Sequence, residues 1–588
     1  MDQRMSEYVE KRNRGTTLRL LKYFSINKVK TFWSIFLAVI MNVAIIIQPL
    51  IVMIIIDDYL AHGIYGVAIM IGLAAAFFFT ALTAQVTGYI QTLVLRSLGQ
   101  EILHKIRTDL FSHIQKMNMR FFDKNSSGRI LTRVTNDVDS LSELYSNIFI
   151  MFVRESLLIV GMLVTMFMLD PVIALWCLIS VPIVLGLTLL YRIIARKNFI
   201  QLKTLLSKIN GYLAENIIGM KINQIFNREK VKYDKFDDMN EEYFRLGMIE
   251  VLLNGLSFPF INMISNLMVA LLIAVFHEQV TGGFLAIGVI FAFTTYVRQL
   301  FQPIANLADQ LTVTQSALIS ADRIFDILDN DDDMEDLKAG RPLTDIKGAI
   351  EFENVSFAYE EGNDVLKNVS FKIEPGQHAA FVGSTGCGKT TIMSLISRFY
   401  EIDRGRILVD GVDTKELNLH SLRQSIAVVM QDVFLFTGDV RYNIRLNNDW
   451  LKNKDIEEAA KIANCHDMIL GFKEGYLHKV AERGSDFSLG QRQLISFARA
   501  VAIKPSLLIL DEATANIDSD TEQALQNGLD TYAHDKTLLV IAHRISTIVN
   551  SDVIFVLEKG EIKERGNHEQ LMLIENGIYK NLHALSQA

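Results

Sequence analysis

A glycine-rich segment in the second half of the chain has the residue types and spacing needed to bind phosphate groups. It matches the pattern G-x-x-x-x-G-K-[ST] and reads Gly383, Ser384, Thr385, Gly386, Cys387, Gly388, Lys389, Thr390 and Thr391. Glycines let backbone N–H groups approach the phosphates, the lysine reaches the β- and γ-phosphates, and the first threonine hydroxyl binds Mg²⁺. An apolar run at 378–382 precedes the loop and a helical run at 392–398 follows it, so a strand–loop–helix unit is expected to position it.

Two carboxylates follow a second apolar run further along the chain. Residues 507–510 read as a buried strand, and Asp511 and Glu512 come directly after them. Asp511 is expected to hold the Mg²⁺ shell, and Glu512 is placed to polarise an attacking water as a general base. Taken alone, the segment is equally a buried parallel strand with a polar end.

A helix start with unusual chemistry lies between these two motifs, within residues 482–493. Ser488 is a good helix N-cap, and Gly490 lets the backbone come close to a ligand. A helix that begins there directs free N–H groups and the positive end of its dipole at an anion. An ordinary capped helix is the alternative. The segment resembles the signature of ATP-binding cassette (ABC) ATPases, in which one subunit's signature closes on ATP held by the other subunit.

This resemblance implies roles for several further residues. Tyr359 resembles the aromatic residue that stacks on adenine, Gln431 the glutamine that touches Mg²⁺ and senses the membrane domain, and His543 the switch histidine at the γ-phosphate. Each would more often be structural if it stood alone, but the phosphate loop, signature and carboxylate pair occur in the order of one family. The signature residues implied to complete a partner's ATP site are Ser488, Gly490 and Gln491.

The first half of the chain carries the apolar segments. Hydrophobic residues make up 50% of the 588 residues, and the mean hydropathy of +0.24 is too high for a soluble ATPase. Six segments have the composition of membrane spans, near 31–56, 64–89, 148–169, 171–191, 251–276 and 282–304. The first segment is too long, and begins too far into the chain, to be a cleaved signal peptide.

Basic residues predict the orientation of these spans. Lys and Arg are frequent in the N-terminal arm and in 91–145 and 192–248, whereas the short connections 57–63, 170 and 277–281 contain neither. The positive-inside rule therefore predicts a multi-pass protein of the cell membrane, with both termini and the ATPase in the cytoplasm. The net charge of −8 averages a basic membrane half with a more acidic remainder, and nothing indicates nucleic-acid binding.

The two long basic segments are expected to form helices that extend below the membrane. If each contains two helices of about 25 residues, they would project roughly 35–40 Å at 1.5 Å per residue. Solvated helical hairpins are the plainer alternative, but ABC exporters have such extensions, and they end in short coupling helices. Residues 121–129 resemble the first coupling region and 215–221 resemble the second. The three cysteines, which lack metal-like spacing and are expected to be reduced, are Cys177, Cys387 and Cys465.

The predicted fold class is an α-helical membrane domain, with six transmembrane helices extended into the cytosol, joined to an α/β P-loop ABC ATPase domain. The expected boundaries are 1–328 for the membrane domain, 329–347 for a linker that begins with an acidic run, and 348–588 for the ATPase domain. The whole chain resembles a bacterial ABC exporter half-transporter, similar to multidrug and lipid exporters. Such a chain must dimerise, and the cofactors implied are ATP and Mg²⁺.

Departures from the family pattern bear on the partner. Phe487 and Leu489 stand where the family signature has Leu and Gly, and residues 515–518 read Ala-Asn-Ile-Asp rather than Ser-Ala-Leu-Asp. Both variants resemble those of heterodimeric exporters with one degenerate ATP site, in which the intact Glu512 would mark the catalytic-Glu subunit. The partner is therefore expected to be a second, different ABC half-transporter, with a homodimer as the alternative.

The substrate is the least constrained part of the interpretation. Spans rich in Met and Phe are able to repack around varied lipophilic compounds. Lipid-facing and helix-packing positions have the same composition, however, so single residues indicate no substrate contact. The expected function is ATP-driven export of lipophilic small molecules by alternating access, in contact with membrane lipids. The alternatives are a homodimeric lipid flippase and an ATP-gated regulatory membrane protein, against which the intact Glu512 and His543 argue.

Overall fold

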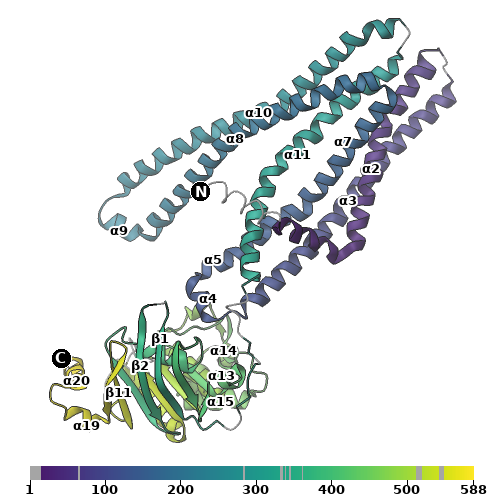
Figure 1. Ribbon diagram of the computed structural model, residues 1–588. Coiled ribbons are helices and arrows are strands. Elements are labelled where there is room, and N and C mark those ends of the chain that lie inside the picture. The colour runs from purple at the N-terminus through teal and green to yellow at the C-terminus, as the bar shows by residue number, and fades with distance from the viewer. Residues whose placement is uncertain are drawn as a thin grey trace. The chain divides into compact units, whose positions relative to one another are not determined.

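The computed structural model describes residues 15–63, 66–282, 285–330, 336–337, 339–343, 346–360, 362–511, 519–541 and 548–587. The chain divides into two compact units (Figure 1). One unit, the helical unit, contains Met1–Gln115 and Ser126–Asp331. The other, the nucleotide unit, contains Lys116–Asn125 and Asp332–Ala588, so a short piece of the first half of the chain belongs to it.

Long α-helices dominate the helical unit. Six of them are α2 (Lys28–Ile54), α3 (Val67–Ile114), α7 (Phe149–Leu169), α8 (Pro171–Ile218), α10 (Glu229–Thr281) and α11 (Ile287–Leu328). Shorter segments connect them, among them α5 (Ser127–Thr132), α6 (Val138–Glu143) and α9 (Met220–Ile225). Local chemistry sets some ends: α8 begins with Pro171, and the Asp170 carboxylate accepts hydrogen bonds from the Val172 and Ile173 N–H groups.

Four helical stretches among the described residues are long and apolar enough to cross a membrane: 15–60, 67–114, 127–169 and 262–281. They contain the expected first and third spans, nearly all of the second and much of the fifth. The expected fourth span lies in α8 and most of the sixth lies in α11, and neither helix meets this criterion within the described residues. Six spans therefore remain a prediction.

Three of the long helices are much longer than a bilayer's hydrocarbon core is thick. With 48 residues in α3 and α8 and 53 in α10, each is about 70–80 Å long, against roughly 30 Å of bilayer hydrocarbon. Helices α8 and α10 lie side by side, and the short α9 joins them at their far end (Figure 1). The expected second coupling region, 215–221, thus falls on the last turn of α8 and the start of α9, and the short helix itself lies further along.

Two sheets form the framework of the nucleotide unit. The strand order of the larger is β12 (Glu561–Gly566), β11 (Val553–Glu558), β3 (His378–Gly383), β10 (Thr537–Ile541), β9 (Leu507–Asp511) and β6 (Ile426–Val429). Its strands are parallel except β12. The smaller sheet is antiparallel, in the order β2 (Asp364–Ile373), β1 (Ile350–Ala358), β4 (Arg404–Val409) and β5 (Val412–Asp413).

Helices surround these sheets. They are α4 (Met119–Lys124), α12 (Lys389–Ile396), α13 (Leu419–Ser425), α14 (Val440–Arg445), α15 (Asn453–Ile462), α16 (His466–Leu470), α17 (Leu489–Ala502), α18 (Ser519–Tyr532), α19 (His568–Met572) and α20 (Ile578–Gln587). A two-stranded ribbon pairs β7 (Gly438–Asp439) with β8 (Lys479–Val480). The α/β class predicted for this half of the chain is confirmed.

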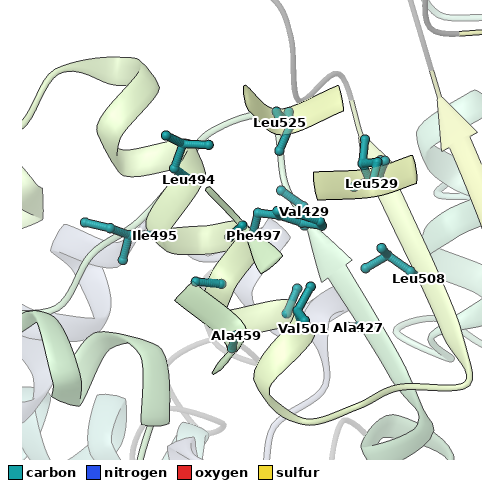
Figure 2. Packing of buried hydrophobic residues seen from close by; sticks show 14 of the residues in the cluster. Ala427, Val429, Ala459, Leu494, Ile495, Phe497, Val501, Leu508, Leu525 and Leu529 are labelled. Atoms are coloured by element: carbon teal, nitrogen blue, oxygen red, sulfur yellow. The ribbon is translucent and has the colours of Figure 1, made fainter. Parts of the chain in front are cut away.

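Two apolar cores hold the nucleotide unit together. One lies between the sheets, where the rings of Phe352, Phe371, Phe381 and Phe555 pack together. The other packs Phe497 and Val501 of α17 with Leu508 of β9 and with leucines of α18 (Figure 2). Because all five residues of β9 are buried, its sequence is continuously apolar up to Asp511, as a parallel strand covered on both faces requires.

Candidate nucleotide site

The sheet order brings the phosphate loop and the predicted carboxylate pair to one edge. Strand β10 lies between β3 and β9, and its last residue, Ile541, pairs with Phe381 on one side and Asp511 on the other. The loop that follows β3 and the carboxylate that ends β9 are therefore two strand spacings apart, about 10 Å. Ligands of parallel α/β sheets bind at such carboxyl ends.

Backbone conformation and one buried cation shape the phosphate loop. Gly388 has φ +106°, and a Cβ there would lie 2.6 Å from the Leu366 side chain, so this position requires glycine. Lys389 begins α12, is almost fully buried, and donates from Nζ to the carbonyl oxygens of Gly383 (2.8 Å) and Ser384 (3.1 Å). The ammonium group is thus held inside the loop, where it faces the space that phosphates would fill.

Asp511 and Thr390 form the part of the site that suits a divalent cation. The Asp511 carboxyl is buried and accepts a hydrogen bond from the Thr390 side chain. Burial raises the pKa of Asp511, while the Thr390 hydrogen bond and the Lys389 charge act in the opposite direction. A carboxylate and a hydroxyl oxygen are ligands that Mg²⁺ accepts, so the donor set fits this ion.

A cavity of about 610 Å³ lies over the loop, a volume within the usual range for small-molecule sites. Most residues lining it were predicted site residues: Tyr359, Thr385, Gly386, Gly388, Lys389, Thr390, Thr391, Gln431 and Asp511. Tyr359, from the turn after β1, hydrogen-bonds through its hydroxyl to the Thr391 Oγ1 at 3.2 Å. Its ring is 40% exposed, which leaves an aromatic surface available to a planar base.

The signature segment forms a preorganised helix start elsewhere in this unit. Ser488 caps α17, and its Oγ accepts from the Gln491 N–H, while Gln491 Oε1 accepts from the Ser488 N–H. Ser488, Gly490 and Gln491 do not line the described cavity. The single chain therefore presents a phosphate site and a separate helix N-terminus, each with the chemistry of half a nucleotide site.

Comparison with known proteins agrees with this division. Residues 31–304 match the family description "ABC transporter transmembrane region", and residues 366–515 match "ABC transporter". The "probable multidrug resistance ABC transporter ATP-binding/permease protein" of Bacillus subtilis is 39% identical over 496 residues, which cover 84% of this chain and 73% of the relative. The chain belongs to the ABC transporter family.

Two further ABC transporters illustrate the range of relatives. A "fatty acid ABC transporter ATP-binding/permease protein" of Mycobacterium bovis is 35% identical over 85% of this chain and 78% of its own length. An "ATP-dependent lipid A-core flippase" of Syntrophus aciditrophicus is 36% identical over 84% of this chain and 82% of its own length. With its ATP-binding and transmembrane parts in one polypeptide, this chain is an ATP-hydrolysing membrane transporter.

The unusual phenylalanine of this ABC transporter's signature has a packing role. Phe487 is buried, and its ring meets Phe472 edge-on at 5.3 Å and His478 at 5.9 Å, while those two rings stack at 4.9 Å. Such edge-to-face contacts stabilise aromatic clusters. The departure from Leu therefore fills space in the subunit's own core, immediately before the Ser488 cap.

Three predicted residues of the phosphate loop do not line the cavity. Gly383 and Ser384 contribute their carbonyl oxygens to Lys389 instead. Cys387 is 3% exposed, its Sγ lies 3.8 Å from Lys389 Nζ, and a Cβ on Gly383 would come within 2.7 Å of that sulfur. Its side chain therefore lies beneath the loop, in the apolar core, rather than facing the nucleotide space.

Sequence reasoning missed two residues that line the cavity, Val365 of β2 and Ile541 of β10. An apolar residue in a strand carries no sign of a ligand, so only the sheet arrangement reveals them. Glu512, His543 and residues 515–518 lie outside the described residues. The roles of Glu512 as general base and of His543 as switch histidine remain predictions, as does the correspondence of 515–518 to the family's Ser-Ala-Leu-Asp segment (the D-loop).

Proposed function

We propose that this chain is one half of an exporter that uses MgATP to move lipophilic small molecules outward across the cytoplasmic membrane by alternating access. The observation that carries the proposal is the assignment of residues 116–125, from the first long connection between apolar helices, to the nucleotide unit. A transporter needs such a mechanical link between ATP and the spans. The functions named for relatives (multidrug resistance, fatty acid transport and lipid A-core flipping) support a lipophilic cargo.

The cavity lining supports the roles proposed for the described site residues, whereas those of Glu512 and His543 rest on the family resemblance. Lys389 contacts the β- and γ-phosphates, Thr390 and Asp511 hold Mg²⁺ together with Gln431, and Tyr359 stacks on adenine. A Mg²⁺ ion held by these residues would neutralise negative charge that develops on the phosphates during hydrolysis. Glu512 would orient and deprotonate the attacking water, and His543 would contact the γ-phosphate.

We further propose that two half-transporters face each other so that α17 of one closes on the ATP of the other. The capped N-terminus at Ser488 supports this, because its N–H groups and dipole suit the γ-phosphate of a facing subunit. A second, different half-transporter is the favoured partner, because Leu489 and residues 515–518 depart from the family pattern as they do in heterodimeric exporters. Phe487 supports this less, since packing within its own subunit accounts for it. A homodimeric lipid flippase is the second candidate, favoured by the flippase relative.

The proposed placement is a cell-membrane protein with six spans and both termini in the cytoplasm. The basic residues of 91–145 and 192–248, and their absence from the three short connections, support this orientation. The very long α3, α8 and α10 support it too, because each is more than twice the length a span requires.

Transport in proteoliposomes tests the proposal. The chain is purified from its native host with any partner that remains bound, and is reconstituted into liposomes. Uptake is measured for the molecules whose nucleotide unit lies on the outer surface, where added MgATP reaches it. We expect MgATP to drive uptake of a lipophilic fluorescent dye, and Glu512→Gln to abolish it. Movement of a fluorescent phospholipid but no dye by the chain alone would favour the homodimeric flippase. ATP hydrolysis without movement of either compound would contradict both transport proposals.

A further inference from the structure

Helix α4 is anchored within the nucleotide unit although its neighbours in sequence, α3 and α5, belong to the helical unit. The Asn118 side chain caps it by accepting a hydrogen bond from the Phe121 N–H at 3.1 Å, and the Phe121 ring is buried. These contacts fix the rotation of the helix. Asp123, on the following part of α4, accepts a hydrogen bond from the Tyr400 hydroxyl at 2.7 Å.

Tyr400 also contacts Tyr359, a residue that lines the nucleotide cavity. It follows α12, the helix that begins with Lys389, and its ring meets Tyr359 edge-on, with ring centres 5.1 Å apart and planes at 90°. Phe357 closes the cluster, at 4.9 Å from Tyr359 and 5.7 Å from Tyr400. A displacement of the Tyr359 ring toward or away from Tyr400 therefore disturbs the Tyr400 ring, because the two rings pack edge to face.

The hydrogen bond from Tyr400 to Asp123 is a charge-assisted one. Burial raises the pKa of Tyr400, and the bond to Asp123 raises it further, so the phenol keeps its proton at any physiological pH. A protonated phenol has a single O–H to donate. In this arrangement it is given to Asp123, and the bond holds only while the Tyr400 ring keeps its position.

We infer that Tyr400 is a positioning residue that responds to a bound adenine and transmits its presence to helix α4. Phosphates bound in the phosphate loop without a base would not have this effect. The inference rests on the proposed role of Tyr359 as the adenine platform. Adenine stacked on Tyr359 fixes that ring, which fixes Tyr400, whose hydroxyl then holds Asp123. Nucleotide phosphates without a base would engage Lys389 but would add no constraint on the Tyr359 ring, so they would not stabilise α4 beyond its existing contacts.

Hydrogen–deuterium exchange on the full chain in nanodiscs tests this inference. The two probes are MgATP and magnesium tripolyphosphate, which carries the same phosphates without a base. We expect both probes to slow exchange in residues 383–391. Only MgATP should slow exchange in residues 116–125, by about tenfold, the equilibrium change that a hydrogen bond to a charged group typically brings.

Variants isolate the Tyr400 hydroxyl. Tyr400→Phe keeps the ring packing, and it should remove the effect of MgATP on 116–125 while preserving its effect on 383–391, which also shows that the variant is folded. Asp123→Ala should do the same, whereas Asp123→Asn, which retains an acceptor oxygen, should keep most of the effect. Tyr532→Phe is the matched control, since its hydroxyl bonds to the Pro505 carbonyl, away from this cluster.

Two results would overturn the inference: equal slowing of 116–125 by tripolyphosphate and ATP, or an undiminished ATP effect in Tyr400→Phe. Failure of the proposed function is distinguished by separate measurements. If Tyr359→Ala leaves the Kd for ATP unchanged, the adenine platform is wrong. If dye transport fails while the exchange pattern holds, the export proposal is wrong and the link through Tyr400 stands.

Discussion

Ser488 and Gln491 hydrogen-bond to each other reciprocally, side chain to backbone, at 3.2 and 3.0 Å across the first turn of α17. The signature helix is thus preorganised within a single subunit, and Phe487, buried just before it, anchors the turn. A partner's nucleotide would meet a helix start that needs no rearrangement. Substitutions in this segment should therefore have two distinguishable effects, one on the free energy of unfolding of the subunit and one on the rate of ATP hydrolysis.

Glu512 and Lys389 should show different defects when they are replaced. Glu512→Gln should reduce ATP turnover by about 100-fold or more, as expected for loss of a general base, and leave nucleotide binding intact. The protein should accumulate in a closed, nucleotide-bound state. Lys389→Ala should weaken ATP binding itself, because a buried cation at the phosphates is lost. Equilibrium ATP binding and steady-state ATPase assays distinguish them, and near-normal turnover of Glu512→Gln in a verified homodimer would contradict the base role.

The heterodimer proposal predicts an asymmetric effect at Ser488. Expressed alone, the chain should show little ATPase stimulation by lipophilic compounds. In the assembled pair, Ser488→Ala should reduce turnover less than Glu512→Gln, since Ser488 would serve the degenerate site. Loss of the Ser488 helix cap should lower the free energy of unfolding by about 1 kcal/mol. Thermal unfolding of the variant measures this effect separately from turnover. Strong drug-stimulated turnover by the lone chain in nanodiscs would exclude an obligatory heterodimer.

Asp511 should destabilise the fold when no cation balances its charge. Burial raises its pKa above the value in the unfolded chain, so the folded state binds the proton more tightly. The contribution of the Asp511 carboxyl to stability is therefore most favourable at a pH below its pKa in the unfolded chain. It is lost as the pH rises through the pKa of Asp511 in the folded protein. Asp511→Asn should therefore raise the Tm of the nucleotide-free protein at neutral pH, with a gain that shrinks on acidification, while abolishing ATPase activity. A lower Tm for Asp511→Asn at neutral pH would contradict this sign.

Cysteine labelling should be slow at Cys387 and slower still at Cys465. Cys387 lies at the phosphate loop, 3.8 Å from the Lys389 ammonium, whereas Cys465 is in the core and burial raises its pKa to about 12. Because Cys387 is buried, N-ethylmaleimide should inhibit ATPase activity only slowly, as the phosphate loop opens; MgATP, which holds the loop, should protect, and Cys387→Ala should be active and resistant. Mass spectrometry of the labelled protein assigns the site. Modification of Cys465 before Cys387 would contradict the expectation.

Phe487→Leu, which restores the common family residue, should leave a small void beside Phe472 and His478. We expect a loss of about 1–2 kcal/mol in the free energy of unfolding, because a buried ring is replaced by a smaller side chain. Turnover should change little, since Ser488 and Gln491 keep their mutual bonds. Phe472→Leu is the matched control within the same cluster. A large gain in ATPase activity for Phe487→Leu would show instead that the aromatic residue limits catalysis.

Motifs with fixed spacing were predictable because each combines several residues of constrained type. The expected strand at 378–382 is β3, and Asp511 ends β9 as predicted. Hydropathy located apolar segments but not helix ends, since a helix such as α10 keeps its backbone hydrogen bonds beyond the apolar part. Tyr400, Val365 and Ile541 were not predictable. A lone tyrosine or an apolar strand residue acquires its role only from neighbours that are distant in sequence.

The short helix α12 has Lys389 at its first residue, and Tyr400 follows just past its end. Inserting one residue into α12 would rotate the helical residues that follow by about 100° about the helix axis. The Lys389 ammonium would stay in its loop, but the Tyr400 hydroxyl would point away from Asp123. Lineages of this protein should therefore tolerate substitutions within α12, positions 389–396, more readily than a change in the length of this helix.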